Sequence, residues 1–88
     1  MANYKYKVNY YRNGNEVLDK IVTLENATWQ ESFEKMQEIL KTAKRKTTFV
    51  DIYSDDTKYV KNRNYDENLN EVTDNPVYAF VETVTKRW

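Results

Sequence analysis

The stretch at residues 28–46, TWQESFEKMQEILKTAKRK, decides the fold. Its apolar residues recur at steps of four, three, four and three, which places them on one side of an α-helix; they are Trp29, Phe33, Met36, Leu40 and Ala43. Thr28, followed three residues later by Glu31, has the spacing of a capping box at the start of a helix. No other stretch has a comparable helical pattern, so the sequence predicts one helical layer over any sheet that forms.

The predicted helix ends in a basic run, Lys41, Lys44, Arg45 and Lys46. Basic side chains complement the negative end of the helix dipole, and the same run has the composition of a phosphate-binding patch. We favour dipole complementation, because four basic residues are few for a nucleic-acid footprint.

Composition limits the classes of protein to consider. A chain of 88 residues predicts one domain, 1–88, and its 14 basic and 14 acidic residues give no net field for duplex DNA. No apolar run approaches the ~20 residues that span a bilayer, and the first residues lack the apolar block of a signal peptide. We therefore expect a cytoplasmic protein without membrane contact.

Abundant Lys, Asn and Tyr are typical of an A/T-rich genome, such as that of a bacteriophage or mobile element in a low-GC host.

The first third of the chain predicts a β-hairpin. Residues 3–11 alternate, and the turn at residues 12–15, RNGN, contains the only glycine. A two-residue turn at Asn13-Gly14 would set Lys7 against Lys20. A three-residue loop would instead pair Val8 with Leu18 and Lys7 with Asp19, so we favour this register.

Two or three further strands are expected after the helix, depending on whether Lys58–Tyr65 forms one. Thr47–Tyr53 alternates as a strand, and Lys58–Tyr65 is weakly patterned, which favours an edge position. Asp66–Pro76 is a polar loop. Val77–Lys86 is apolar on both sides at its start, which is typical of a central strand.

This order predicts an α+β two-layer sandwich, with one α-helix packed on a mixed sheet of four to five strands in the order β-β-α-β-(β)-β. A right-handed crossover through the helix would set a later strand beside and parallel to the first. In outline the order resembles the β-grasp arrangement of the immunoglobulin-binding domains of bacterial surface proteins. The resemblance is one of element order, so it assigns no functional residue.

The chain lacks the residues that most kinds of enzyme catalysis need. The chain has no histidine and no cysteine, which removes the usual zinc sites and nucleophile–base pairs. Its single glycine cannot form a phosphate-cradling loop. The series Asp66, Asn68, Asn70 opens like a calcium loop, but Glu71 and Val77 occupy the positions that need glycine and glutamate. We therefore expect no enzymatic activity, no cofactor and no metal site.

A binding surface is the remaining candidate. If the aliphatic side of the sheet (Val8, Leu18, Val22, Val50, Ile52, Val81) meets the helix, its aromatic side is left uncovered. That side is predicted to carry seven partner-binding residues, namely Lys5, Lys7, Tyr11, Phe49, Tyr53, Tyr78 and Phe80.

The sequence thus predicts a non-enzymatic protein-binding module, an inhibitor or adaptor. It would act through this aromatic face or an edge strand, on another protein or on a second copy as a homodimer. The alternative is single-stranded nucleic-acid binding, with bases stacked on the aromatic rings and phosphates on Lys5, Lys7 and Arg12.

Overall fold

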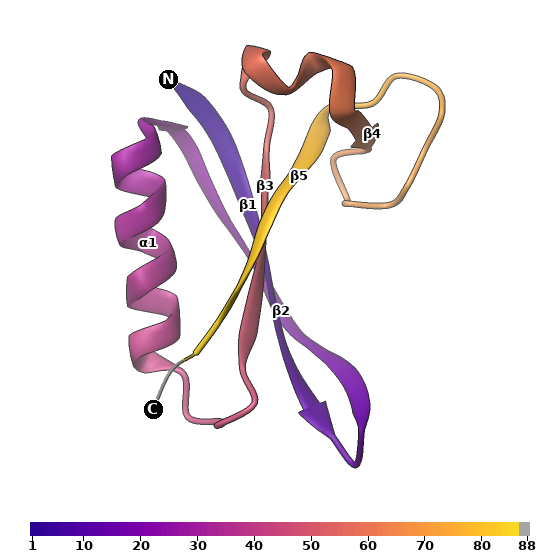
Figure 1. Cartoon of the computed structure of the whole chain (residues 1–88). Helices are drawn as coiled ribbons and strands as arrows, with labels where there is room; N and C mark the ends of the chain where they lie inside the picture. The colour runs from indigo at the N-terminus through magenta and orange to yellow at the C-terminus, as the bar shows by residue number, and fades with distance from the viewer. Residues whose placement is uncertain (87–88) are drawn as a thin grey trace.

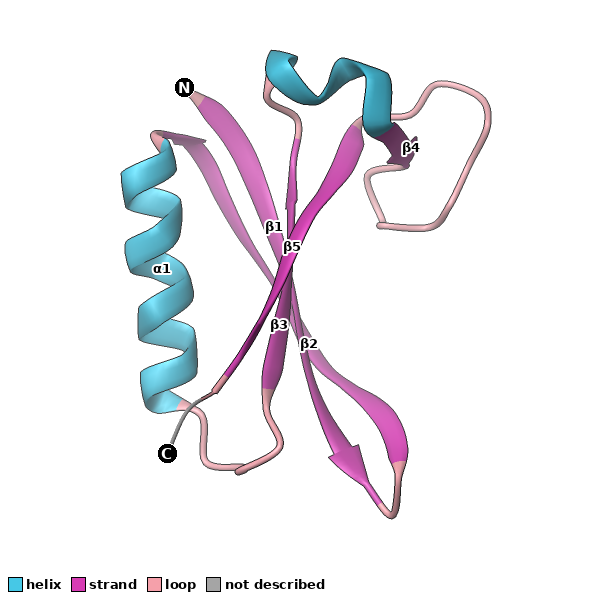
Figure 2. Ribbon diagram, in the orientation of Figure 1, coloured by secondary structure: helices cyan, strands magenta, loops and turns pink. Residues whose placement is uncertain are grey.

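The computed structural model describes residues 1–86 and has one α-helix lying on a twisted five-stranded sheet (Figures 1 and 2). The α+β two-layer arrangement is therefore as predicted. The elements, in chain order, are β1 (Ala2–Arg12), β2 (Asn15–Ala27), α1 (Trp29–Thr42), β3 (Phe49–Ser54), the 3-10 helix η1 (Thr57–Asn62), β4 (Arg63–Tyr65) and β5 (Tyr78–Thr85).

The sheet is antiparallel throughout, in the order β2-β1-β3-β5-β4. The expected mixed sheet, with a later strand parallel to the first, is therefore wrong. The helix returns the chain to the hairpin-turn end of the sheet, so β3 starts there and runs antiparallel to its neighbour β1 (Figure 1). The resemblance to the β-grasp arrangement is limited to the order of the first elements along the chain.

The β1–β2 hairpin combines features of both predicted registers. Asn13 and Gly14 both have positive φ, of 52° and 80°, so the turn has two residues and Arg12 pairs with Asn15. A β-bulge then follows. Asn9 pairs with Leu18 and Val8 with Lys20, which leaves Asp19 as the extra residue.

The predicted pairing of Val8 with Leu18 and of Lys7 with Asp19 is therefore wrong. The bulge removes the clash that had argued against a two-residue turn, because Lys7 now opposes Ile21. Leu18, expected in the core, lies on the opposite face and is 53% exposed. Beyond the bulge, Tyr4 and Tyr6 pair with Leu24 and Val22, and all four contribute to the core as expected.

The helix begins and is capped as predicted, but a different line of residues faces the sheet. Thr28 Oγ1 accepts from the Glu31 N–H, and Glu31 Oε1 accepts from the Thr28 N–H. The buried helical residues are Ser32, Met36 and Ile39, whereas Trp29 and Phe33 are 39% and 42% exposed.

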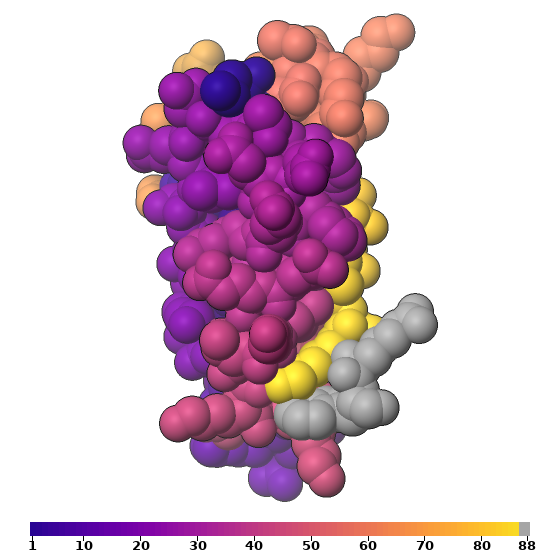
Figure 3. Space-filling model, turned by 90° about the vertical axis from the view of Figure 1, so that its left-hand side faces the viewer, coloured from indigo at the N-terminus to yellow at the C-terminus, as the bar shows by residue number. Residues whose placement is uncertain are grey.

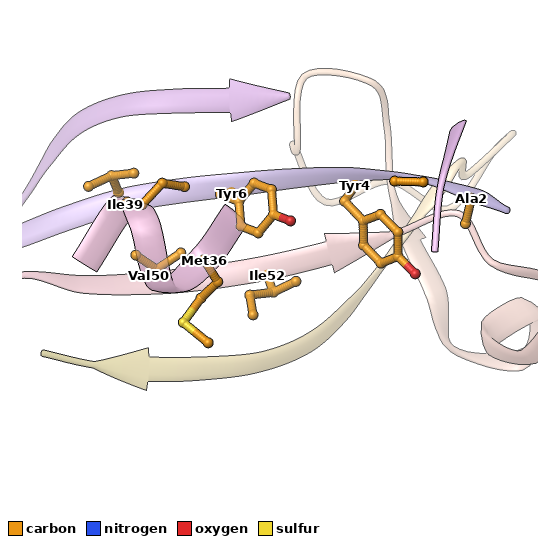
Figure 4. Close-up of a cluster of buried hydrophobic side chains, with 9 residues drawn as sticks. Ala2, Tyr4, Tyr6, Met36, Ile39, Val50 and Ile52 are labelled. Atoms are coloured by element: carbon orange, nitrogen blue, oxygen red, sulfur yellow. The ribbon is translucent and has the colours of Figure 1, made fainter. Parts of the chain in front are cut away.

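The helix is rotated in this way because the small side chain of Ser32 lets the helix approach the large ring of Tyr6. Tyr6 is fully buried and its hydroxyl donates to the Ser32 carbonyl at 2.8 Å. Figure 4 shows this ring among Met36, Ile52, Val50 and Ile39, at the centre of the main core.

The segment after β3 only partly matches the expected fourth strand at Lys58–Tyr65. Residues 57–62 form η1, which Asp56 caps by accepting the Lys58 N–H at 3.1 Å. Of the expected strand, only Arg63–Tyr65 forms β4, and it pairs with β5 at the edge of the sheet, as expected. A three-residue β4 leaves most of β5 without an outer neighbour.

The bulge at Asp19 yields a test of the register. Deleting Asp19 should leave a regular ladder with every core side chain on its present face, so the free energy of unfolding should change by no more than about 1 kcal/mol. Deleting Thr23 instead should move Leu24 to the opposite face and cost several kcal/mol. Urea unfolding followed by circular dichroism measures both. Equal losses for the two deletions would contradict the assigned register.

Candidate functional site

The sheet face opposite the helix is covered at one end by the chain itself. Leu69, in the loop between β4 and β5, packs against Tyr53 and Tyr78 in a second small core, with Tyr65 and Val77 beside it. Leu69 is 2% exposed and has a positive φ of 64°, a conformation that a branched residue adopts only when its surroundings impose it. Leu69 therefore acts as a fixed plug over this half of the aromatic face.

Asp66 organises the loop that carries the plug. Its Oδ1 accepts the backbone N–H groups of Asn68 and Asn70, at 2.8 and 2.9 Å. These hydrogen bonds hold the pKa of Asp66 below its ordinary value, the bond from Asn70 contributing most. The carboxylate that would open a calcium loop is thus used to shape the turn. Within residues 1–86, no three His, Cys, Asp or Glu side chains gather to hold a metal ion.

The two lysines of the predicted site lie over aromatic rings. Lys5 Nζ is 5.3 Å from the ring centroid of Tyr78 and donates to the Glu67 carbonyl, which ties β1 to the loop. Lys7 Nζ is 5.8 Å from the centroid of Tyr53. These contacts hold both ammonium groups against the protein's own rings.

The expectation of an uncovered aromatic face is therefore wrong for most of its rings. Phe49, Tyr53 and Tyr78 are between 5% and 7% exposed, so they fill the fold instead of presenting a surface. Burial, assisted by the nearby charge of Asp51, raises the pKa of Tyr53 to about 12. Only Tyr11 and Phe80, 46% and 43% exposed, offer large aromatic area to solvent among the predicted residues.

The other end of this face is open. Tyr11 stacks on Phe49, with ring centroids 5.2 Å apart, and its hydroxyl donates to Glu16 at 3.2 Å. Beside the stack is a hollow of about 340 Å³ whose lining includes Asp51, Thr83 and Lys86. Thr83 Oγ1 donates to Asp51 Oδ1 at 2.5 Å, so these two polar groups of the hollow are already paired with each other.

The outer edge of β5 is the least protected part of the sheet. β5 pairs with β3 along its length but with β4 only at Tyr78 and Ala79. The Lys86 N–H donates to the Thr48 carbonyl at 3.0 Å, and hydrogen-bonding direction alternates along a strand. The backbone N–H and C=O groups of Glu82 and Val84 therefore also point toward β3. Those of Thr83 and Thr85 point the other way, outward from the sheet.

An apolar groove runs beside this edge on the helix side. It has a volume of about 600 Å³ and lies between α1 and the second half of β5. Figure 3 views the molecule from the helix side and shows β5, in yellow, at the surface along the margin of the helix. The groove is lined by Phe33, Met36, Gln37, Leu40, Lys41, Glu82, Val84 and Thr85.

The opposite edge of the sheet, along β2, is longer but better protected. It carries the Asp19 bulge and the charged residues Glu16, Lys20 and Glu25. Bulges and charges are common devices against edge-to-edge pairing. The part of β5 that β4 leaves unpaired, Phe80–Thr85, contains one charged residue, Glu82, and no proline. β5 is thus the edge to which an added strand would pair most readily.

Comparison of the chain with models of protein families, with curated proteins and with solved structures finds no match. Over residues 1–86, no helix combines the length and apolar character needed to cross a membrane.

The groove and the β5 edge were not among the predicted site residues. The exposed position of Phe33 depends on how the helix is rotated, and the free edge depends on the shortness of β4, so periodicity could reveal neither.

The role of Leu69 as a plug is testable. Leu69→Ala should lower the free energy of unfolding by about 2–4 kcal/mol, as other buried leucines do. It should also admit water to Tyr53, so the pKa of that hydroxyl should fall from about 12 toward its ordinary value. Ultraviolet titration, with Tyr53→Phe to assign the signal, measures this shift. The exposed Leu18→Ala is the matched control and should change stability by less than about 0.5 kcal/mol; equal effects at the two leucines would contradict the plug.

Proposed function

We propose that this protein is a non-enzymatic binding module that takes an extended segment of another protein as an added strand on the outer edge of β5. The supporting observation is the coincidence of two features at one place. The outward backbone groups of Thr83 and Thr85 lie beside the apolar groove lined by Phe33, Leu40 and Val84. In strand addition, main-chain hydrogen bonds give affinity and adjacent pockets select alternate side chains.

The groove defines what the added strand should look like. Its lining is mostly apolar and also includes the charged residues Lys41 and Glu82. Side chains of an added strand alternate between the two faces, so every second residue would reach the groove. The preferred segment therefore carries aliphatic or aromatic residues at alternate positions. A cytoplasmic inhibitor or adaptor of a bacteriophage or mobile element is the setting that we propose.

Single-stranded nucleic-acid binding is a second candidate, favoured by a separate observation. Lys20, Lys44 and Arg45 line one hollow, and Arg12 and Arg45 both lie over the ring of Tyr10. Arg45 lies 3.9 Å from the ring centroid of Tyr10. The engagement of Lys5 and Lys7 with rings and the nearby negative end of α1 disfavour this candidate. Retention of single-stranded DNA on filters that falls steeply with salt would favour it instead.

Strand addition can be tested with Thr83→Pro. Proline removes the outward N–H of residue 83 while leaving the β3 side of the ladder intact, and edge strands tolerate it. Thr83→Val is the matched control, since it also loses the hydroxyl bonded to Asp51 but keeps the N–H. A displayed library of random peptides supplies the probe. The selected peptides are then synthesised and titrated by fluorescence anisotropy.

We expect the selected peptides to alternate apolar residues, and to bind Thr83→Pro at least about tenfold more weakly than wild type or Thr83→Val. Leu40→Lys, in the groove, should weaken binding too, whereas Leu18→Lys, on the other face, should not. Peptides that bind all four variants alike, or a library from which nothing is selected, would contradict the proposal.

A further inference from the structure

The exposed end of β5 has a sequence that is complementary to itself. Residues 82–86 read Glu-Thr-Val-Thr-Lys, so reversing the segment exchanges the two charged ends and leaves the uncharged centre unchanged. Two copies of such a segment placed antiparallel bring threonine opposite threonine, valine opposite valine, and glutamate opposite lysine. Cross-strand pairs of each of these kinds stabilise a sheet.

The side chains concerned already lie on the appropriate faces. Glu82 and Val84 line the groove beside α1, and Lys86 reaches the same side of the sheet, where its ammonium group donates to the Ala43 carbonyl at the end of the helix. Glu82 and Lys86 of two antiparallel copies would therefore meet on one face. An ammonium group has three donors, so the bond to Ala43 is compatible with a carboxylate contact.

The backbone selects the same alignment. With Val84 on the two-fold axis, Thr83 of each copy faces Thr85 of the other, and these are the two residues whose N–H and C=O groups point outward. The alignment thus forms two hydrogen-bonded pairs, with four N–H···O bonds in total. Moving the axis to Glu82 would set two carboxylates against each other, which is unfavourable. Moving it to Thr83 would place Glu82 opposite an apolar valine.

The groove and the opposite edge favour a closed pair over a longer assembly. About the axis at Val84, the grooves of the two copies become continuous, and the exposed rings of Phe33 border a shared apolar floor. A β5-to-β2 contact would repeat without end and build a fibre. The bulge and charges of β2 act against that contact.

We infer that a second copy of this chain occupies the β5 edge, in an antiparallel dimer centred on Val84. The inference rests on the proposed strand addition and names one occupant of the same edge, so dimerisation and capture of another protein's strand compete. The paired segment is short, and an interface of this kind is characteristic of a reversible dimer.

Charge exchange tests the inference in the full-length chain. Sedimentation velocity from about 1 µM to about 1 mM should show the 10.6 kDa monomer giving way to a species of twice that mass. Glu82→Lys and Lys86→Glu should each raise the dimer dissociation constant at least about tenfold, because each creates like-charge pairs across the axis. An equimolar mixture of the two single variants restores opposite charges, so it should form a heterodimer within about threefold of wild-type affinity.

Thr83→Pro should also abolish the dimer and Thr83→Val should not; the charge variants decide the matter if the proline variant fails to fold. A chain that stays monomeric at every concentration, or a mixture that associates no better than its components, overturns the dimer. A dimer that forms equally well in all of these variants overturns it too, since its contact must then lie elsewhere. If the chain stays monomeric at every concentration without peptide and still binds the selected peptides, the dimer is overturned while strand addition stands.

Discussion

The contact between Tyr6 and Ser32 sets how the only long helix of the described chain lies on the sheet. The ring of Tyr6 fills the space beneath the small Ser32 side chain, and its hydroxyl donates to the Ser32 carbonyl. This contact orients Ser32, Met36 and Ile39 toward β1 and β3. The more apolar Phe33 is consequently turned toward the side of β5, where it borders the groove. The groove beside the β5 edge thus follows from one packing contact in the core.

The opposite face is protected by other means. Residues 1–86 place no second α-helix on that face, yet Tyr53 and Tyr78 are buried to about the same extent as Ile39 of α1. Leu69 covers them from the β4–β5 loop, and the stems of Lys5 and Lys7 lie over the same rings. A polar loop and two charged side chains therefore replace a second helical layer. For this reason the candidate binding surface is the edge of the sheet and not its face.

Local patterns predicted local structure well here. The spacing of Thr28 and Glu31 predicted the capping box, and the alternation of residues 3–11 predicted β1 and its buried tyrosines. Features that depend on distant contacts were not predictable in the same way. One extra residue at Asp19 changes every pairing beyond it without altering the composition of the strand. Leu69 is a single apolar residue in a polar loop, and only the folded chain identifies what it covers. The self-complementary segment 82–86 is visible in the sequence, but its exposure depends on the length of β4.

The most direct test of this account is amide hydrogen exchange along β5, measured by NMR as a function of protein concentration. In dilute solution the amides of Glu82 and Val84, which face β3, should be protected, whereas those of Thr83 and Thr85 should exchange rapidly. Raising the concentration should slow exchange at Thr83 and Thr85 alone, as a second strand covers them. Strong protection of these two amides in the dilute monomer would mean that the chain covers its own edge, and would contradict the account.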